Sequence, residues 1–126
     1  MGRTAVMGIS GNARIVAGYA EAILTGIPAE RFGRFAEGRD GPVRSNHPAW
    51  VCGHLALYPG RVAGMLGLDV DVTPPEDWEA LFGPGSACED DRAGTIYPPK
   101  PELVDRLLDF QERIAEGLLG LDDEAL

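Results

Sequence analysis

The sequence contains few of the residues that build disulfide frameworks and metal clusters. Its 126 residues include two cysteines and two histidines. Cys52 and Cys88 lie far apart and in no paired motif, so we expect two free thiols in a reduced, cytoplasmic protein. No run of about 18 apolar residues is present, which predicts that no segment spans a membrane.

Basic residues are scarce as well. The 11 lysines and arginines are outnumbered by 20 aspartates and glutamates, giving a net charge of −9. Without a basic cluster, such a chain is expected to repel phosphate backbones, which argues against a nucleic-acid partner. Hydrophobic residues make up 44% of the chain, as in ordinary globular proteins, and the length fits one domain over residues 1–126.

Apolar residues recur at helical spacing in three long segments, residues 10–26, 47–66 and 101–119. The second helix is expected to start at an Asn46 cap and to end at Gly67. Pro59 removes a backbone donor inside it, which predicts a kink or break near residues 55–58. The expected buried stripes are Ile15, Tyr19, Ile23 and Ile27 in the first helix, and Leu103, Leu107, Phe110, Ile114 and Leu118 in the third.

The segments between these helices are predicted to be connections. Residues 28–46 contain turn chemistry at 38–42, and we expect no strand there. In residues 68–100, Thr73-Pro-Pro-Glu76 looks like a capping box that starts a short helix through Trp78, Leu81 and Phe82. The acidic run 89–91 lacks the alternating pattern of a calcium loop, so it is interpreted as a solvated loop. The prediction is an all-α fold with three long helices and one short helix.

The two histidines are the main candidates for chemistry. His47 and His54 are seven residues apart, about 10 Å along a helix, which is too far for both to bind one metal ion. Taken alone, His54 is either a packed, hydrogen-bonded histidine or a metal ligand. His47 precedes Pro48 and is expected to face solvent or to cap the helix. Tyr58 lies four residues after His54 and is expected either to line a pocket with it or to be a core tyrosine with its hydroxyl at the end of the bundle.

The segment Asn46-His-Pro-Ala-Trp-Val-Cys-Gly-His-Leu55 resembles the second-helix signature of the DinB/YfiT-like superfamily, roughly Pro-x-Trp-x-x-Gly-His-Leu. The later run Leu81-Phe-Gly-Pro-Gly-Ser-Ala-Cys-Glu-Asp-Asp91, followed by Tyr97-Pro and a further helix, is similar too. The resemblance covers the chain from about residue 10. It implies a four-helix bundle, often dimeric, with a long connection between the second and third helices.

The resemblance also implies a site. Many members bind nickel or zinc through three histidines, one of which matches His54, while the other two come from a His-x-x-x-His in the fourth helix. Characterised relatives include S-transferases and isomerases that use a low-molecular-weight thiol such as bacillithiol or mycothiol, with the metal activating a thiolate or water. The matching Trp50 would pack and Gly53 would permit close helix approach. Against the family pattern, the fourth helix is expected to be absent.

Three functional hypotheses follow from the sequence. The first is a DinB-like metalloenzyme, a metal-dependent transferase or hydrolase acting on a small-molecule substrate, with His54 as metal ligand and Trp50 and Tyr58 as pocket residues. The second is a non-catalytic helical dimerisation or binding module, because a bundle lacking one helix leaves an apolar groove for a partner. The third is a small-ligand pocket between the first two helices, with no metal.

Overall fold

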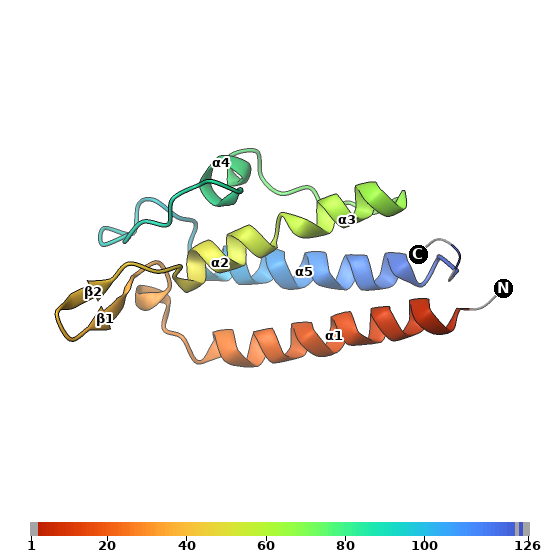
Figure 1. The fold of residues 1–126 in the computed structure, drawn as a ribbon, viewed down its shortest axis with the longest axis horizontal. Coiled ribbons are helices and arrows are strands. Elements are labelled where there is room, and N and C mark those ends of the chain that lie inside the picture. The colour runs from red at the N-terminus through yellow and green to blue at the C-terminus, as the bar shows by residue number, and fades with distance from the viewer. Residues whose placement is uncertain (1–2, 123, 125–126) are drawn as a thin grey trace.

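A computed structural model describes residues 3–122 and 124 of the chain, and the described part is mostly helical. The elements in order are α1 (Thr4–Thr25), a 3-10 turn η1 (Ala29–Arg31), β1 (Ala36–Gly38), β2 (Gly41–Val43), α2 (Pro48–Leu55), α3 (Tyr58–Leu66), α4 (Trp78–Phe82) and α5 (Lys100–Leu118). Figure 1 shows α5 running between α1 on one side and α2 and α3 on the other. No helix in the described ranges is long and apolar enough to cross a membrane.

Helix α1 starts six residues earlier than predicted and packs against α5 through a different stripe. Its inward positions hold mainly small side chains, and the Ser10 hydroxyl donates a 2.8 Å hydrogen bond to the Ala115 carbonyl of α5. Small residues let two helices approach closely, so this face, rather than the bulkier one, packs on α5. The predicted buried stripe was therefore wrong at three of its positions, which are 58–69% exposed: Ile15, Tyr19 and Ile23.

The predicted break in the second helical segment is confirmed. Helix α2 ends at Leu55 and α3 begins at Tyr58, with Pro59 in the first turn of α3, where its missing donor costs nothing. Gly67 ends α3 in the left-handed conformation (φ 66°), as expected of a glycine after a helix. The cap of α2 is His47 rather than Asn46, since the His47 ring accepts the Trp50 backbone N–H.

The capping box predicted for the short helix was wrong. Helix α4 begins at Trp78, its N-cap residue is Asp77, and no side chain caps it. The buried stripe predicted for α5 is confirmed at all five positions. On the outer face of α5, Arg113 pairs with Asp109 at 3.0 Å, whereas the Arg106 guanidinium lies over the Trp78 and Phe110 rings.

A short hairpin interrupts the helical pattern, so the expectation of no strand was wrong. Ala36 pairs with Val43 and Gly38 with Gly41 in an antiparallel ladder. Gly41 adopts φ 118°, a conformation that favours glycine, at the turn predicted for residues 38–42. Only three residues lie in each strand, which is too short for periodicity to reveal them.

Candidate functional site

His54 of α2 lies at the centre of an aromatic cluster. Its ring stacks on the Trp50 ring, with centroids 4.6 Å apart and planes 12° apart. The Tyr58 ring meets its other side edge-on at 5.2 Å. Trp50 and His54 lie one turn apart on α2 and Tyr58 begins α3, so their spacing of four residues brings them together across the break between the two helices.

The hydrogen bonds of His54 define which of its nitrogens carries the proton. Its Nδ1 lies 2.7 Å from the Phe82 carbonyl oxygen, which can only accept, so Nδ1 donates. In the neutral ring Nε2 then keeps its lone pair, and it accepts a 3.1 Å hydrogen bond from the Tyr58 hydroxyl. A ring nitrogen free of a proton, held in place by a carbonyl on the opposite nitrogen, is the arrangement found in metal-ligating histidines.

The Phe82 carbonyl reaches His54 because α4 packs directly on α2. A Cβ atom built on Gly53 would lie 2.4 Å from the Phe82 ring, a distance that no side chain could occupy without displacing it. Gly53 therefore sets the approach of α4, which matches the close-packing role expected for it. The Trp50 indole N–H donates to the Ser86 hydroxyl at 3.0 Å, fixing the other ring of the stack.

One of the two expectations for His47 is confirmed and the other was wrong. It caps α2, as one of the two expectations had it, but it is 2% exposed rather than facing solvent. Its Nδ1 accepts the Trp50 backbone N–H at 3.2 Å and its Nε2 donates to the Glu89 carbonyl at 2.7 Å. Both ring nitrogens are thus used within the fold, so His47 holds the 86–91 loop against the start of α2.

The acidic run 89–91 is more than a solvated loop, and that interpretation was wrong for Asp91. This residue is 7% exposed, and its carboxylate accepts backbone N–H groups of Thr95, Ile96 and Tyr97 at 2.9–3.1 Å. Burial acts to raise the pKa of Asp91, but the backbone donors outweigh it and lower the pKa below its ordinary value. The carboxylate therefore organises the loop that precedes α5.

The resemblance implies a metal held by three histidines, and His54 is the residue that matches one of them. In the described part of the chain, no group of three or more histidine, cysteine, aspartate or glutamate side chains is placed to hold one metal ion. Cys52 is buried, and its burial raises the pKa of the thiol to about 11, which keeps it protonated. His54 fits the position of one imidazole ligand, and a structural or catalytic zinc site needs at least three protein ligands.

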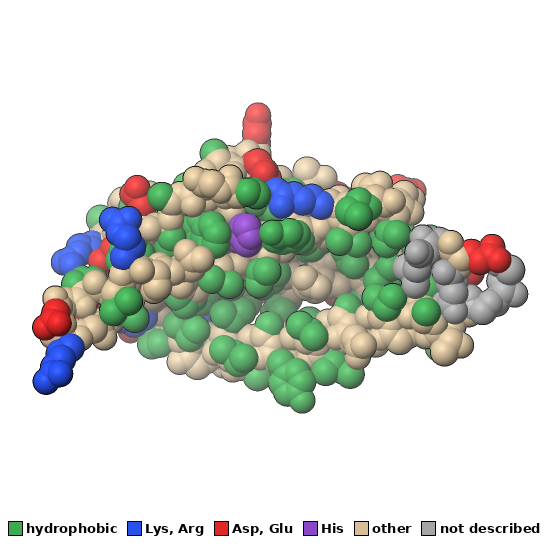
Figure 2. Space-filling view, viewed as in Figure 1, with side chains coloured by type: hydrophobic (Ala, Val, Ile, Leu, Met, Phe, Trp, Pro, Cys, Tyr) green, Lys and Arg blue, Asp and Glu red, His purple; other side chains and the backbone are tan. Residues whose placement is uncertain are grey.

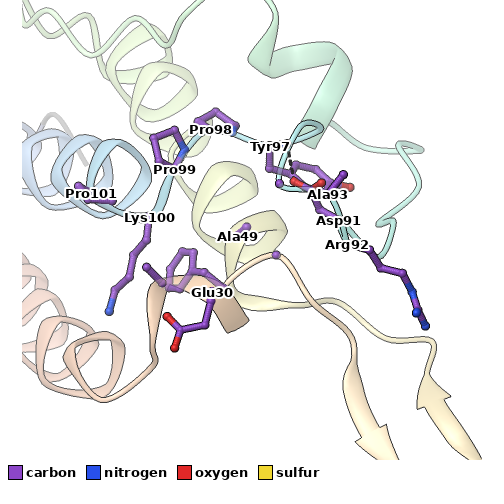
Figure 3. A pocket seen from close by; sticks show the side chains of 14 residues that line it. Glu30, Ala49, Asp91, Arg92, Ala93, Tyr97, Pro98, Pro99, Lys100 and Pro101 are labelled. Carbon is purple, nitrogen blue, oxygen red and sulfur yellow. Dashed lines mark hydrogen bonds between the residues drawn. The ribbon is translucent and has the colours of Figure 1, made fainter.

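A cavity of about 550 Å³ lies elsewhere, between η1, the start of α2, residues 91–94 and the start of α5. Figure 3 shows that its two basic side chains, Lys100 and Arg92, point away from each other. The Lys100 ammonium lies over the Phe32 ring and donates to the Ile27 carbonyl. This cavity does not include His54, and it does not lie between the first two long helices as the third hypothesis required.

His54 opens instead onto an exposed hydrophobic surface. Figure 2 shows hydrophobic side chains over α1 and over α2 and α3, a histidine among them and a hollow between the two rows. We call this surface the apolar face and define it by eight side chains that are 38–85% exposed: Ile15, Val16, Tyr19, Ile23, Val51, Leu55, Tyr58 and Met65.

Comparison with family models, curated proteins and solved structures found no match for this chain.

Proposed function

We propose that this chain is a DinB-like helical domain whose working group is the Nε2 atom of His54, presented beside the apolar face as one ligand for a divalent metal such as nickel or zinc. The observation that supports this most directly is the 2.7 Å contact of Nδ1 with the Phe82 carbonyl. In the neutral ring that contact places the proton on Nδ1 and leaves the Nε2 lone pair free, which is the form of the ring that binds metals.

The remaining ligands have to come from whatever covers the apolar face, because the described residues offer one imidazole at this place. A metal completed in this way would supply a Lewis acid to a bound substrate or low-molecular-weight thiol. The contribution of this chain is to orient the ring between Trp50 and Tyr58. The two unpaired thiols agree with a cytoplasmic setting.

The test is titration of the full chain with Zn²⁺ or Ni²⁺. Nitrogen NMR signals of the ring atoms of both histidines report the binding. Binding at His54 moves its Nε2 signal and leaves Nδ1 protonated, while His47 stays unchanged because both of its nitrogens are bonded. A His54→Asn variant should lose the response. Metal binding of equal strength in that variant would refute the proposal.

A second candidate function is a docking module, and the apolar face is the observation that favours it. Soluble monomers rarely expose contiguous apolar patches above about 300–600 Å². Here eight apolar or aromatic side chains that are 38–85% exposed gather on one surface. An apolar dye that binds wild-type protein but not a variant with a charge at Tyr19 would support docking at this face.

A further inference from the structure

The cavity of about 550 Å³ beside η1 is separate from the histidine cluster of α2, and the proposed function does not use it. Its walls come from η1, the start of α2, residues 91–94 and the segment that leads into α5. The Ala49 N–H donates to the Phe32 carbonyl at 2.8 Å, which ties α2 to η1. The Asp91 N–H donates to the Gly33 carbonyl at 2.8 Å, which ties the loop to the same place. The fold itself therefore fixes the shape of the cavity, as it does in most ligand sites.

The cavity extends from the surface into the core, and its lining is mainly apolar. Ala93 in its lining is exposed, whereas Phe32 is 2% exposed and Ala49 is 1% exposed. Figure 3 shows Ala49 between the segment 98–101 on one side and Tyr97 on the other. Three of the four residues 98–101 are prolines, which have no backbone donor. A cavity of this volume fits a small organic molecule, and this lining favours one with an apolar body.

Four charged side chains line the cavity, and Lys100 differs from the other three. The Asp91 carboxylate is bonded by backbone N–H groups of its own loop. The Arg92 guanidinium pairs with Asp90 at 3.3 Å and points away from Lys100 (Figure 3). Glu30 is exposed, so water and salt screen its charge. Lys100 is half-buried and is therefore the charge best placed to act on a ligand.

Lys100 is the single lysine among the 11 basic residues of the chain. Its ammonium donates to the Ile27 carbonyl and lies 5.6 Å from the centroid of the Phe32 ring. These two contacts hold the ammonium in place. Because an ammonium has three N–H donors, two remain for a ligand. A carboxylate is a natural partner for them, since hydrogen bonds between two charged groups are the strong ones.

The charge of Lys100 also acts inside the fold. Among the described residues, no carboxylate forms an ion pair with it. Cys52 lies one turn after Ala49 on α2. Burial raises the pKa of the Cys52 thiol to about 11, and the positive charge of Lys100 acts in the opposite direction. The same charge would attract an anion that enters the cavity.

We infer that this cavity binds a small organic carboxylate with an apolar or aromatic body. The carboxylate accepts hydrogen bonds from the Lys100 ammonium, and the body lies against Phe32, Ala49 and the proline-rich segment 98–101. Binding is non-covalent. The inference depends neither on metal binding by His54 nor on docking at the apolar face.

The experiment is titration of the full chain with phenylacetate, observed by NMR of lysine labelled with carbon-13 at Cε. Because Lys100 is the only lysine, one signal reports the site. It should shift and saturate with a dissociation constant on the order of 1 mM. Phenylacetamide has nearly the same shape without the charge, and it should bind about tenfold more weakly or worse. Absence of saturation at about ten times that concentration, or equal binding of the amide, overturns the inference.

Substitutions of Lys100 test its role, with the amide signals of Gly33 and Gly94 reporting binding at the cavity. Lys100→Met should weaken phenylacetate binding by about tenfold or more, whereas Lys100→Arg keeps the charge and should bind within a few-fold of the wild type. Arg106→Met is the matched control. Arg106 lies on the same helix and also over aromatic rings, but outside this cavity. It should bind as the wild type does.

Two results would contradict the role of Lys100: wild-type affinity in Lys100→Met, and an equal loss in Arg106→Met. If Lys100→Met fails to fold, the comparison of phenylacetate with its amide on the wild-type chain still decides whether the cavity selects a carboxylate.

Discussion

The Nδ1 atom of His54 lies 2.7 Å from the carbonyl oxygen of Phe82, 28 residues further along the chain. This contact joins α2 to the end of α4 and fixes the proton of the imidazole on the side away from Tyr58. Gly53 makes it possible, because any side chain there would collide with the Phe82 ring. The position of the proton on the His54 ring therefore depends on the close packing of Gly53 against the Phe82 ring.

Substitution of Gly53 tests this link. Gly53→Ala places a methyl group where the Phe82 ring lies, and overpacking of this kind costs about 1–3 kcal/mol. Denaturant unfolding should show the loss in the free energy of unfolding. Gly64→Ala in α3 is the matched control, because nothing lies within 4 Å of its Cβ position, and alanine there should be neutral or stabilise by up to about 1 kcal/mol. Equal effects of the two substitutions would contradict the close approach of α4.

Removal of the Tyr58 hydroxyl should expose the His54 lone pair. In Tyr58→Phe the ring remains, but Nε2 loses its 3.1 Å hydrogen bond. The rate of acylation of His54 by diethyl pyrocarbonate is expected to rise severalfold, while stability changes by less than about 1 kcal/mol because the site is exposed. His47, being buried and doubly bonded, serves as the internal control and should stay unmodified. An unchanged rate at His54 would argue against the assigned tautomer.

Asp91 should make the fold sensitive to acid. Its folded pKa lies below the unfolded value of about 3.9. Its stabilising effect is therefore complete above that pH and is lost as the pH falls through the folded pKa. Asp91→Asn should cost about 1–3 kcal/mol at neutral pH, since buried backbone donors lose a charged acceptor, and should flatten the dependence of stability on pH below about pH 4.

The neighbouring exposed residue gives the comparison for Asp91. Glu89→Gln removes a charge from the same loop without removing a buried acceptor, and it should change the free energy of unfolding by less than about 0.5 kcal/mol. If the two substitutions had similar effects, Asp91 would not organise the loop.

The buried thiol should be inert in the folded protein. Burial is the largest influence on Cys52 and raises its pKa to about 11, so little thiolate forms near pH 8. Ellman's reagent should therefore label Cys52 only as the protein unfolds, at a rate that increases with denaturant. Cys88 is half-buried and also has a raised pKa, chiefly from burial. Cys88 should react slowly in the native state. A Cys52→Ala variant, in which Cys88 is the remaining thiol, allows this reaction to be measured alone. Rapid labelling of Cys52 in native protein would contradict its burial.

Periodicity predicted the parts of the fold that depend on one element at a time. The stripe of α5, the break before Pro59 and the end of α3 at Gly67 follow from local chemistry. The buried side of α1 could not be predicted in the same way, because that helix is apolar on two sides. Which side is buried depends on the close approach of α5, where Ser10 bonds Ala115, and this is a relationship between distant residues.

The candidate site likewise has a part that the sequence predicts and a part that depends on contacts between distant residues. Helical spacing places Trp50, His54 and Tyr58 on neighbouring turns, so their association was predictable. The Phe82 carbonyl carries no signal in the sequence, since every residue has one, and its role depends on the packing of α4. The Asp91 carboxylate was equally hidden, because an acidic run looks the same whether it is solvated or bonded by backbone N–H groups.

The most direct test of the central claim is nitrogen NMR of the His54 ring in the full chain, before and after addition of Zn²⁺. The structure predicts that the neutral form of the ring carries its proton on Nδ1, and that Zn²⁺ produces a change at Nε2 that His54→Asn abolishes. A proton on Nε2 in the metal-free protein, with no response of either ring nitrogen to the metal, would contradict it.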